Sequence, residues 1–213
     1  MLIINYKAYE KAVGENCEKL TKTIAEAAAE EKAEVIINPQ TADLNRIETE
    51  ELTVYAQHTD PVGTGSHTGS NQIKALKDAG VTGTLINHPE RRLKDEKIDE
   101  TIQKCREEGL TTVVCAQTVE ECEEYASYEP DYIAFEPPEL IGGDTAVSTA
   151  EPHVIENAVE ASGKIPTLTG AGIKSKKDVE KSEELGCEGV LVASGVIKAE
   201  DVKKEVKELC KGL

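Results

Sequence analysis

The chain has 213 residues and a formal net charge of −17, from 41 acidic and 24 basic side chains. Such a surface repels the phosphate backbone of nucleic acids, so no nucleic-acid partner is expected. An apolar segment begins within two residues of the amino terminus, so we expect no signal peptide. No apolar run reaches the roughly 18 residues that suggest a membrane span. We expect a cytoplasmic protein with six reduced cysteines, Cys17, Cys105, Cys115, Cys122, Cys187 and Cys210.

The acidic excess has two interpretations that the composition leaves open. It marks either a salt-adapted protein, kept solvated by its surface carboxylates, or an ordinary acidic protein. In both cases the surface repels an anionic ligand at long range. A site for such a ligand therefore needs Lys side chains and backbone N–H groups close by. Because aromatic residues make up only 3% of the chain, the core must consist of aliphatic residues.

Short apolar segments rich in β-branched residues alternate with helical patterns along the whole chain. We predict eight strands, over residues 2–6, 35–38, 52–57, 83–87, 111–117, 132–136, 166–170 and 189–193. Their nearly continuous apolar character is typical of parallel strands buried on both faces.

Amphipathic helices are predicted between these strands. The apolar stripes at helical spacing are Cys17, Leu20, Ile24 and Ala28; Ile98, Ile102 and Cys105; and Val202, Val206 and Leu209. A short and weakly patterned helix is expected somewhere in residues 42–49. Glycines that suit a left-handed helix end precede several strands, at Gly80, Gly109, Gly163 and Gly186. Ser175 and Asp178 have the spacing of a capping box at the start of the seventh helix.

Eight strand–helix units without a break in composition predict one domain over residues 1–213. Their alternation indicates an α/β protein with a parallel sheet and right-handed crossovers. Eight units can close that sheet into a (β/α)8 barrel, the TIM-barrel architecture, whose interior is filled by branched aliphatic side chains. A doubly wound open sheet is the alternative fold.

In such a barrel the chemistry lies at the carboxyl ends of the strands. Lys7 follows the first predicted strand, His88 the fourth and Glu136 the sixth. Each alone is usually structural: a solvated Lys, a hydrogen-bonded His or a Glu that caps a turn. Together they supply a cation, an imidazole and a carboxylate at one end of the barrel. Proton transfer beside a carbonyl group needs such a set.

Two loops of small residues follow the seventh and eighth predicted strands, Gly170-Ala171-Gly172 and Ala193-Ser194-Gly195. Backbone N–H groups in such loops can approach a phosphate closely, although tight turns also use Gly. The sequence EPPELIGGDTAVS at residues 136–148 has two prolines at one end and two glycines in the middle. We interpret it as a lid that excludes water, with a plain long connection as the alternative.

These residues lie in strings that closely resemble archaeal triosephosphate isomerases. The strings are NYKAY (5–9), AQH (56–58), GSHTG (65–69), NHPERR (87–92), EPPELIG (136–142), GAGI (170–173) and ASGV (193–196), and the likeness covers essentially the whole chain in order. The resemblance implies interconversion of glyceraldehyde 3-phosphate and dihydroxyacetone phosphate through an enediolate, a step of glycolysis and gluconeogenesis. No cofactor and no metal ion are implied.

The resemblance also implies residue roles. Glu136 is similar to the base of the family, His88 to the group that polarises the carbonyl, and Lys7 to the cation that stabilises the phosphate and the enediolate. The remaining substrate-binding positions implied are Asn5, Tyr6, Ile141, Gly172, Ala193 and Ser194. The backbone N–H of Glu90 is expected to donate a hydrogen bond to the His88 ring.

The sequence departs from the family pattern at two places. Pro89 stands where relatives have Ser, and the lid reads GGDTAVS where relatives commonly read GTGIPVS. Pro suits the first position of a helix, so we expect a short helix after His88, whose amino terminus would keep the imidazole neutral.

The chain also resembles the shortened archaeal barrels that assemble as tetramers. Residues 59–70 are similar to the arm that inserts into a neighbouring subunit, so we expect a homo-oligomer, with a tetramer as the expected form. Two other functions remain open at this point: another phosphate-binding barrel, such as a phosphoribosyl isomerase, and a barrel that binds phosphate ligands but has lost turnover.

Overall fold

The computed structural model describes residues 1–138, 152–170 and 172–213. Eight parallel strands pair in chain order and close into a barrel, because β1 is hydrogen-bonded to both β2 and β8. The strands are β1 (Leu2–Asn5), β2 (Val35–Asn38), β3 (Thr53–Ala56), β4 (Gly83–Ile86), β5 (Thr111–Ala116), β6 (Tyr132–Phe135), β7 (Thr167–Thr169) and β8 (Gly189–Val192). The predicted (β/α)8 barrel is confirmed and the open sheet was the wrong alternative.

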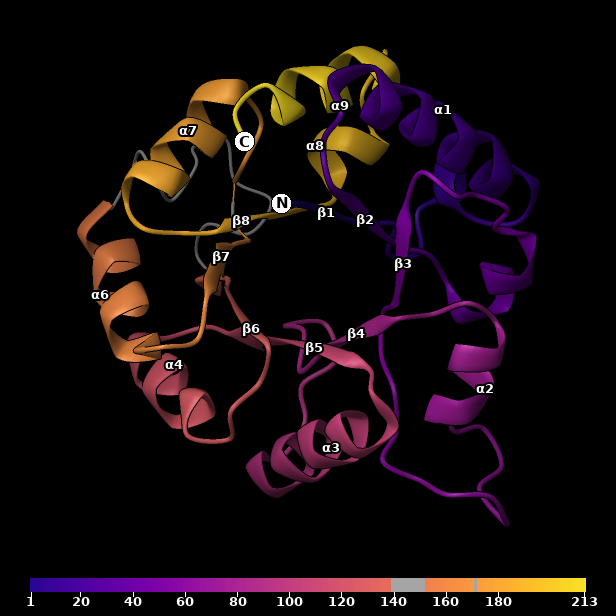
Figure 1. Cartoon of the computed structure of the whole chain (residues 1–213), viewed down its shortest axis with the longest axis vertical. Helices are drawn as coiled ribbons and strands as arrows, with labels where there is room; N and C mark the ends of the chain where they lie inside the picture. Colours follow the sequence, from indigo (N-terminus) through magenta and orange to yellow (C-terminus); the bar gives the residue numbers. More distant parts are fainter. Residues whose placement is uncertain (139–151, 171) are drawn as a thin grey trace.

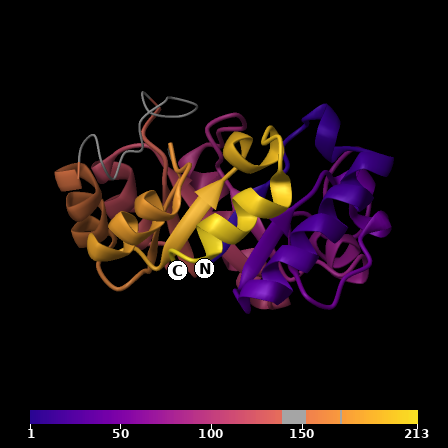
Figure 2. The ribbon, with the colours of Figure 1, turned by 90° about the horizontal axis from the view of Figure 1, so that it is seen from above.

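Helices form a ring outside the barrel (Figure 1). They are α1 (Glu15–Glu31), α2 (Ile73–Asp78), α3 (Asp95–Glu108), α4 (Val119–Ala126), α6 (Pro152–Ser162), α7 (Lys176–Glu184), α8 (Ser194–Ile197) and α9 (Val202–Cys210), with two 3-10 helices, η1 (Glu10–Ala12) and η2 (Thr41–Arg46). Figure 2 shows both termini at one end of the barrel. Because β1 starts at that end, the carboxyl ends of the parallel strands form the opposite mouth.

Side chains of each strand alternate between the barrel interior and the helices. In β1, Ile3 belongs to the interior cluster, whereas Leu2 and Ile4 pack in the cluster under α1 and α9. The interior cluster consists of Ile3, Ile36, Tyr55, Leu85, Val113, Cys115, Ala134, Leu168 and Leu191. Aliphatic residues dominate it, as predicted. By the same alternation, Asn5 at the end of β1 and Glu136 directly after β6 point to the interior at the mouth.

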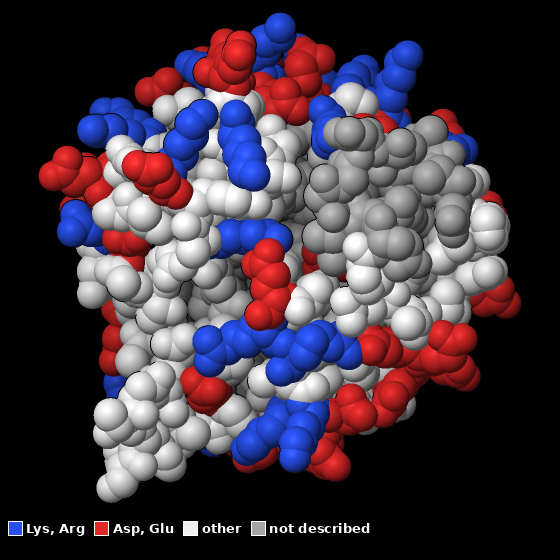
Figure 3. Space-filling model, turned by 180° about the vertical axis from the view of Figure 1, so that it is seen from behind, with Lys and Arg blue, Asp and Glu red and all other residues white. Residues whose placement is uncertain are grey.

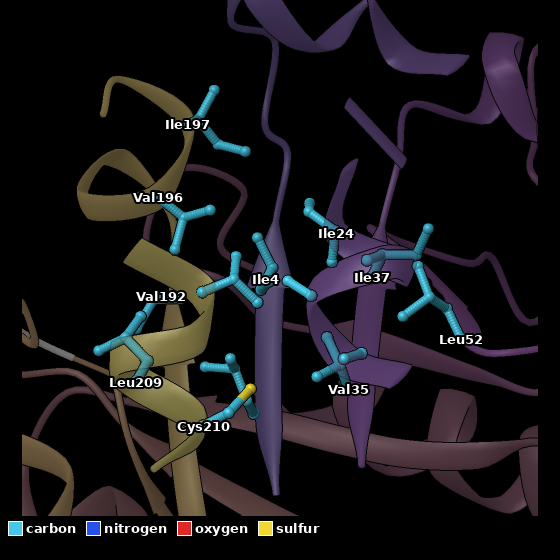
Figure 4. Close-up of a cluster of buried hydrophobic side chains, with 14 of the residues drawn as sticks. Ile4, Ile24, Val35, Ile37, Leu52, Val192, Val196, Ile197, Leu209 and Cys210 are labelled. Atoms are coloured by element: carbon cyan, nitrogen blue, oxygen red, sulfur yellow. The ribbon is translucent and has the colours of Figure 1, made fainter. Parts of the chain in front are cut away.

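The predicted helical stripes are buried, except for Val202, which is half-buried. Ile24 of α1 and Leu209 of α9 pack with strand residues such as Ile4 and Val192 in one apolar layer between the helices and the barrel (Figure 4). Burial of such aliphatic side chains stabilises the fold by roughly 1.5–3 kcal/mol each. The short helix expected in residues 42–49 is the 3-10 helix η2, whose six residues bury only Asp43 and Leu44.

The predicted helix-end signals are also confirmed. Gly80, Gly109, Gly163 and Gly186 all have positive φ, which a residue without Cβ adopts without strain. Ser175 is the N-cap of α7 and accepts a hydrogen bond from the backbone N–H of Asp178. The glycines fix where helices end before the amino-terminal ends of the strands, and the Ser175 cap fixes where α7 begins on the side of the mouth.

Candidate active site

A cavity of about 240 Å³ opens at the carboxyl ends of the strands. Figure 3 looks onto this mouth and shows basic side chains around a hollow near its centre. The cavity brings together seven of the predicted site residues, Asn5, Lys7, His88, Glu136, Gly172, Ala193 and Ser194. They come from the ends of β1, β4, β6, β7 and β8. Residues far apart in sequence therefore meet only because the sheet closes.

Glu136 follows β6 directly and is only 4% exposed. Burial raises the pKa of this carboxyl to about 7, against the opposing effects of a hydrogen bond from the Cys115 thiol and of the Lys7 charge. Among the described residues, Oε1 of Glu136 has no hydrogen-bond partner. A buried carboxylate with an unused oxygen is poised to accept a proton.

The close approach of Gly170 shapes the space for this carboxyl. A Cβ added at Gly170 would overlap Cγ of Glu136 and would lie 2.8 Å from its Cδ. Only glycine at this position leaves room for the Glu136 side chain as it stands. The glycine of the predicted loop after β7 therefore makes room for the Glu136 carboxyl.

His88 lies in the loop after β4 and is 7% exposed. The backbone N–H of Glu90 donates a hydrogen bond to Nδ1 of His88 at 3.1 Å, as predicted. Because Nδ1 is the acceptor, the ring proton is on Nε2, which faces the cavity. Burial, together with the charge of Lys7, holds the pKa of His88 well below its usual range. The ring is therefore a neutral donor.

The expected cause of this neutrality was wrong. Residues 89–90 form a single turn, closed by the Arg91 N–H donating to the His88 carbonyl at 2.7 Å, and no helix begins there. Helix N-termini act through several aligned N–H groups, which one turn does not provide. Burial and Lys7 depress the pKa instead.

Nε2 of His88 and Oε2 of Glu136 lie 3.8 Å apart. One is a hydrogen-bond donor and the other a proton acceptor, and their pKa values move in opposite directions. A small ligand can thus be held between a group that polarises an oxygen and a group that removes a proton from the adjacent carbon. This separation of roles is what proton transfer beside a carbonyl requires.

Lys7 adopts an uncommon left-handed backbone conformation, with φ of 49°. Three side chains hold it there. Oδ1 of Asn5 accepts from the Lys7 N–H at 2.9 Å, and the side-chain amides of Gln40 and Gln57 donate to the Lys7 carbonyl at 3.2 and 2.9 Å. Strain held in this way at a cavity points to a functional role. The Lys7 ammonium forms an ion pair of 2.7 Å with Glu90.

The loops after β7 and β8 form the other wall of the cavity, through Gly172, Ile173, Ala193, Ser194 and Gly195. Ser194 and Gly195 are the first two residues of α8, whose N–H groups have no partner within a helix. Their N–H groups are candidate donors for an anion in the cavity.

The structure does not bring Tyr6 into the cavity. Its side chain is fully buried and its hydroxyl lies 2.9 Å from Oγ1 of Thr21 in α1. The prediction that Tyr6 binds substrate is wrong for this side chain, because strand alternation turns it toward the helix. Ile141, and with it the predicted lid tip, lies outside the described residues.

Comparison with known proteins gives one consistent result. The model of the family described as triosephosphate isomerase matches residues 1–211. The chain is 43% identical to the triosephosphate isomerase of Methanothermus fervidus, over 98% of this chain and 96% of that protein. It is 44% identical to the triosephosphate isomerase of Methanocaldococcus jannaschii, over 99% of this chain and 99% of that protein. It is also 44% identical to that of Archaeoglobus fulgidus, over 98% of this chain and 96% of that protein.

This chain belongs to the triosephosphate isomerase family. Membership agrees with the resemblance seen in the motifs and makes the chain an aldose–ketose isomerase. Within the described residues, no cluster of His, Cys, Asp and Glu has the arrangement of a metal site. The helices of the same residues include none that is long and apolar enough to cross a membrane.

The sequence reasoning missed three residues that contact or line the cavity groups: Cys115, which hydrogen-bonds Glu136, Gln57, which hydrogen-bonds Lys7, and Lys174. Gln57 and Cys115 lie at the ends of β3 and β5, where alternation from Tyr55 and Val113 points into the barrel, so the pattern could have identified them. Lys174 lies two residues beyond the predicted glycine loop and lines the cavity. A prediction that extended the phosphate loop two residues beyond Gly172 would have included Lys174.

Proposed function

We propose that this chain interconverts glyceraldehyde 3-phosphate and dihydroxyacetone phosphate by proton transfer through an enediolate, with Glu136 as the base. The observation that supports this most strongly is the pair formed by a neutral His88 donor and a Glu136 carboxyl of raised pKa, 3.8 Å apart in one cavity. Full-length relatives named triosephosphate isomerase support the same substrate class.

The proposed reaction needs only groups of this chain. The Glu136 carboxylate removes a proton from the carbon beside the carbonyl, while Nε2–H of His88 donates a hydrogen bond to the carbonyl oxygen. Negative charge develops on that oxygen and the Lys7 ammonium stabilises it. Glu136 then returns the proton to the neighbouring carbon, and the hydroxyl proton moves between the two oxygens. The carbonyl group has changed position and no atom is gained or lost.

Two alternatives share parts of this cavity. A phosphoribosyl isomerase would use the β7 and β8 loops, but it does not call for Lys7, His88 and Glu136 on three other strands. A barrel without turnover would leave unexplained why a carboxyl is kept buried next to a neutral His donor, at a cost in stability.

A coupled assay with the purified protein tests the proposal. Conversion of glyceraldehyde 3-phosphate, with no conversion of a ribose-phosphate substrate, is the expected result. Turnover of the ribose phosphate would favour the first alternative. Binding of the triose phosphate without turnover would favour the second.

We further infer that the chain assembles as a homo-oligomer, with a tetramer as the expected form. Residues 61–72 have no charged side chain, in a chain of which 31% is charged, and residues 63–69 are all exposed. The arm formed by residues 59–70 projects from the body of the molecule (Figures 1 and 3). At its base, Asp60 binds Asn71 through two hydrogen bonds of 2.7 and 2.9 Å, which preorganise it for a partner.

Light scattering tests the assembly. A mass of four times the 23.0 kDa chain is expected, and a monomer at micromolar concentration would contradict the inference.

The six cysteines are all free and buried. This supports a reducing compartment, for which we propose the cytoplasm.

A further inference from the structure

Lys174 lies between β7 and α7, and its side chain lines the same cavity as the proposed catalytic groups. It reaches toward the β8 loop, since a Cβ added at Gly195 would lie 4.0 Å from Cγ of Lys174. The start of the side chain thus lies beside the backbone of the β8 loop at Gly195. Lys174 belongs to the wall of the cavity that the β7 and β8 loops form, whereas Glu136 and His88 follow β6 and β4.

The backbone of Lys174 is held in place by hydrogen bonds with residues at the start of α7. Its N–H donates to Oδ2 of Asp178 at 3.1 Å, and the Ser175 hydroxyl donates to the same oxygen at 2.8 Å. Ser175 in turn caps α7. The start of the Lys174 side chain is therefore held in place by the first turn of α7, although its outer part is exposed.

The charges around the cavity create a need for a second cation. The described charged side chains in the lining are Lys7, Lys174, Glu90 and Glu136. Lys7 is already paired with Glu90 at 2.7 Å, and the whole chain has a net charge of −17. A phosphate monoester, with almost two negative charges at neutral pH, enters against this field. Lys7 alone would have to offset it while also stabilising the reacting oxygens.

We propose that Lys174 is a second phosphate-binding cation of this site, which contacts the phosphate of the substrate and not its reacting carbons. The inference rests on the proposed function. A phosphate is present in substrate, transition state and product alike, so a group that touches only the phosphate binds all three equally. Such uniform binding changes KM and leaves kcat nearly constant. Lys7, in contrast, affects both.

The matched experiment compares Lys174→Ala with Lys177→Ala. Lys177 lies on α7, is exposed and does not line the cavity, so both variants remove one positive charge from the same region. Steady-state kinetics would give kcat and KM for glyceraldehyde 3-phosphate and the inhibition constant of inorganic phosphate. For Lys174→Ala we expect KM and the inhibition constant to rise together by about 3- to 10-fold, with kcat within about 2-fold, as for one exposed charge-assisted contact.

The control variant Lys177→Ala should leave all three constants within about 1.5-fold, which is what screening predicts for a solvated charge farther from the cavity. Lys174→Arg should restore affinity, since it keeps the charge. Equal effects of Lys174→Ala and Lys177→Ala would overturn the proposal, because they would show only a general field. A loss of kcat with unchanged KM would also overturn it.

Failure of the proposed function would be recognised separately. In that case the wild-type protein would not convert the triose phosphate at all. Direct titration of inorganic phosphate, followed by phosphorus NMR, still tests Lys174 in that situation. Weaker binding in Lys174→Ala than in Lys177→Ala would support the phosphate contact, and equal binding would refute it.

Discussion

Glu136 and His88 are placed 3.8 Å apart, and burial favours the uncharged form of both. For a carboxyl this means a raised pKa, and for an imidazole a lowered one. The same physical effect therefore gives a base that binds protons near neutral pH and a donor that stays neutral. The Cys115 thiol, the Glu90 N–H and the absence of a side chain at Gly170 keep the two groups in this arrangement.

The rate should depend on the protonation of Glu136. Only the carboxylate accepts a proton, and the pKa of this group is raised to about 7. We expect kcat/KM to fall tenfold per pH unit below about pH 7, because kcat/KM reports the free enzyme. A pH–rate profile from pH 5 to 9 measures this. A profile that stays flat down to pH 5 would contradict the raised pKa.

His88 should not titrate in the range where histidines usually do. Its pKa is lowered by burial and by Lys7, so we expect nitrogen NMR to show a neutral ring down to about pH 5, below the roughly 6.5 of a free histidine. The proton should reside on Nε2. Titration near pH 6.5, or a proton on Nδ1, would refute the assigned tautomer.

The raised pKa of Glu136 also has a stability consequence. The folded state holds this proton up to about pH 7, whereas the unfolded chain releases it near pH 4.5, the ordinary pKa of a Glu carboxyl. The free energy of unfolding should therefore decrease as pH rises between these values, by up to about 1.4 kcal/mol per pH unit. Urea unfolding should show that Glu136→Gln loses this decrease, while the exposed control Glu123→Gln keeps it. Identical pH dependence in both variants would exclude the effect.

At the scale of elements, the loop after β4 is tied to β5 and α4. The Asn87 side chain accepts from the Leu93 N–H at 2.9 Å and donates to the Cys115 carbonyl at 3.1 Å and the Tyr125 hydroxyl at 3.3 Å. Arg92 adds an ion pair with Glu121 and a hydrogen bond to Tyr125. This network closes the loop on both sides of His88 and orients it.

Tyr125→Phe removes one hydroxyl from that network and leaves the ring in the core. We expect kcat to fall several-fold with KM little changed, because a hydrogen bond of this kind contributes about 0.5–1.5 kcal/mol. Steady-state kinetics give kcat and KM of this variant, and a melting curve measured in parallel gives its stability. The opposite pattern, a lower melting temperature with unchanged kcat, would show that Tyr125 supports the fold and does not position His88.

The elements differ in how far the sequence predicts them. All eight strands lie within their predicted ranges, because apolar segments such as residues 35–38 depend on burial alone. The turn after His88 was predicted as a helix, since Pro89 suits both structures and one turn has no periodicity. The hydrogen bonds of Gln57 and Cys115 were not predicted because they depend on which strand ends meet in space.

At the scale of the whole molecule, the net charge of −17 is only partly offset by surface ion pairs. Lys203 and Lys207 of α9 pair with Glu30 of α1, which lowers the pKa of Glu30 to about 2. Exposed pairs of this kind contribute little to stability, because water and salt screen them. The repulsion among the remaining carboxylates is distributed over the entire surface and is screened by salt.

Stability should therefore rise with salt. We expect the melting temperature to increase from 0.05 to 1 M KCl, which spans most of the screening range. A flat or falling curve would mean that the ion pairs balance the repulsion. It would identify an ordinary acidic protein and not a salt-adapted one.

The central claim is that Glu136 is the base of a triose phosphate isomerisation. Glu136→Gln keeps the size of the side chain and removes its ability to accept a proton. In the coupled assay we expect turnover of this variant to fall by about 10²- to 10⁴-fold, while its affinity for inorganic phosphate stays close to that of the wild-type protein. Turnover near the wild-type rate, in a variant that binds phosphate normally, would contradict the claim.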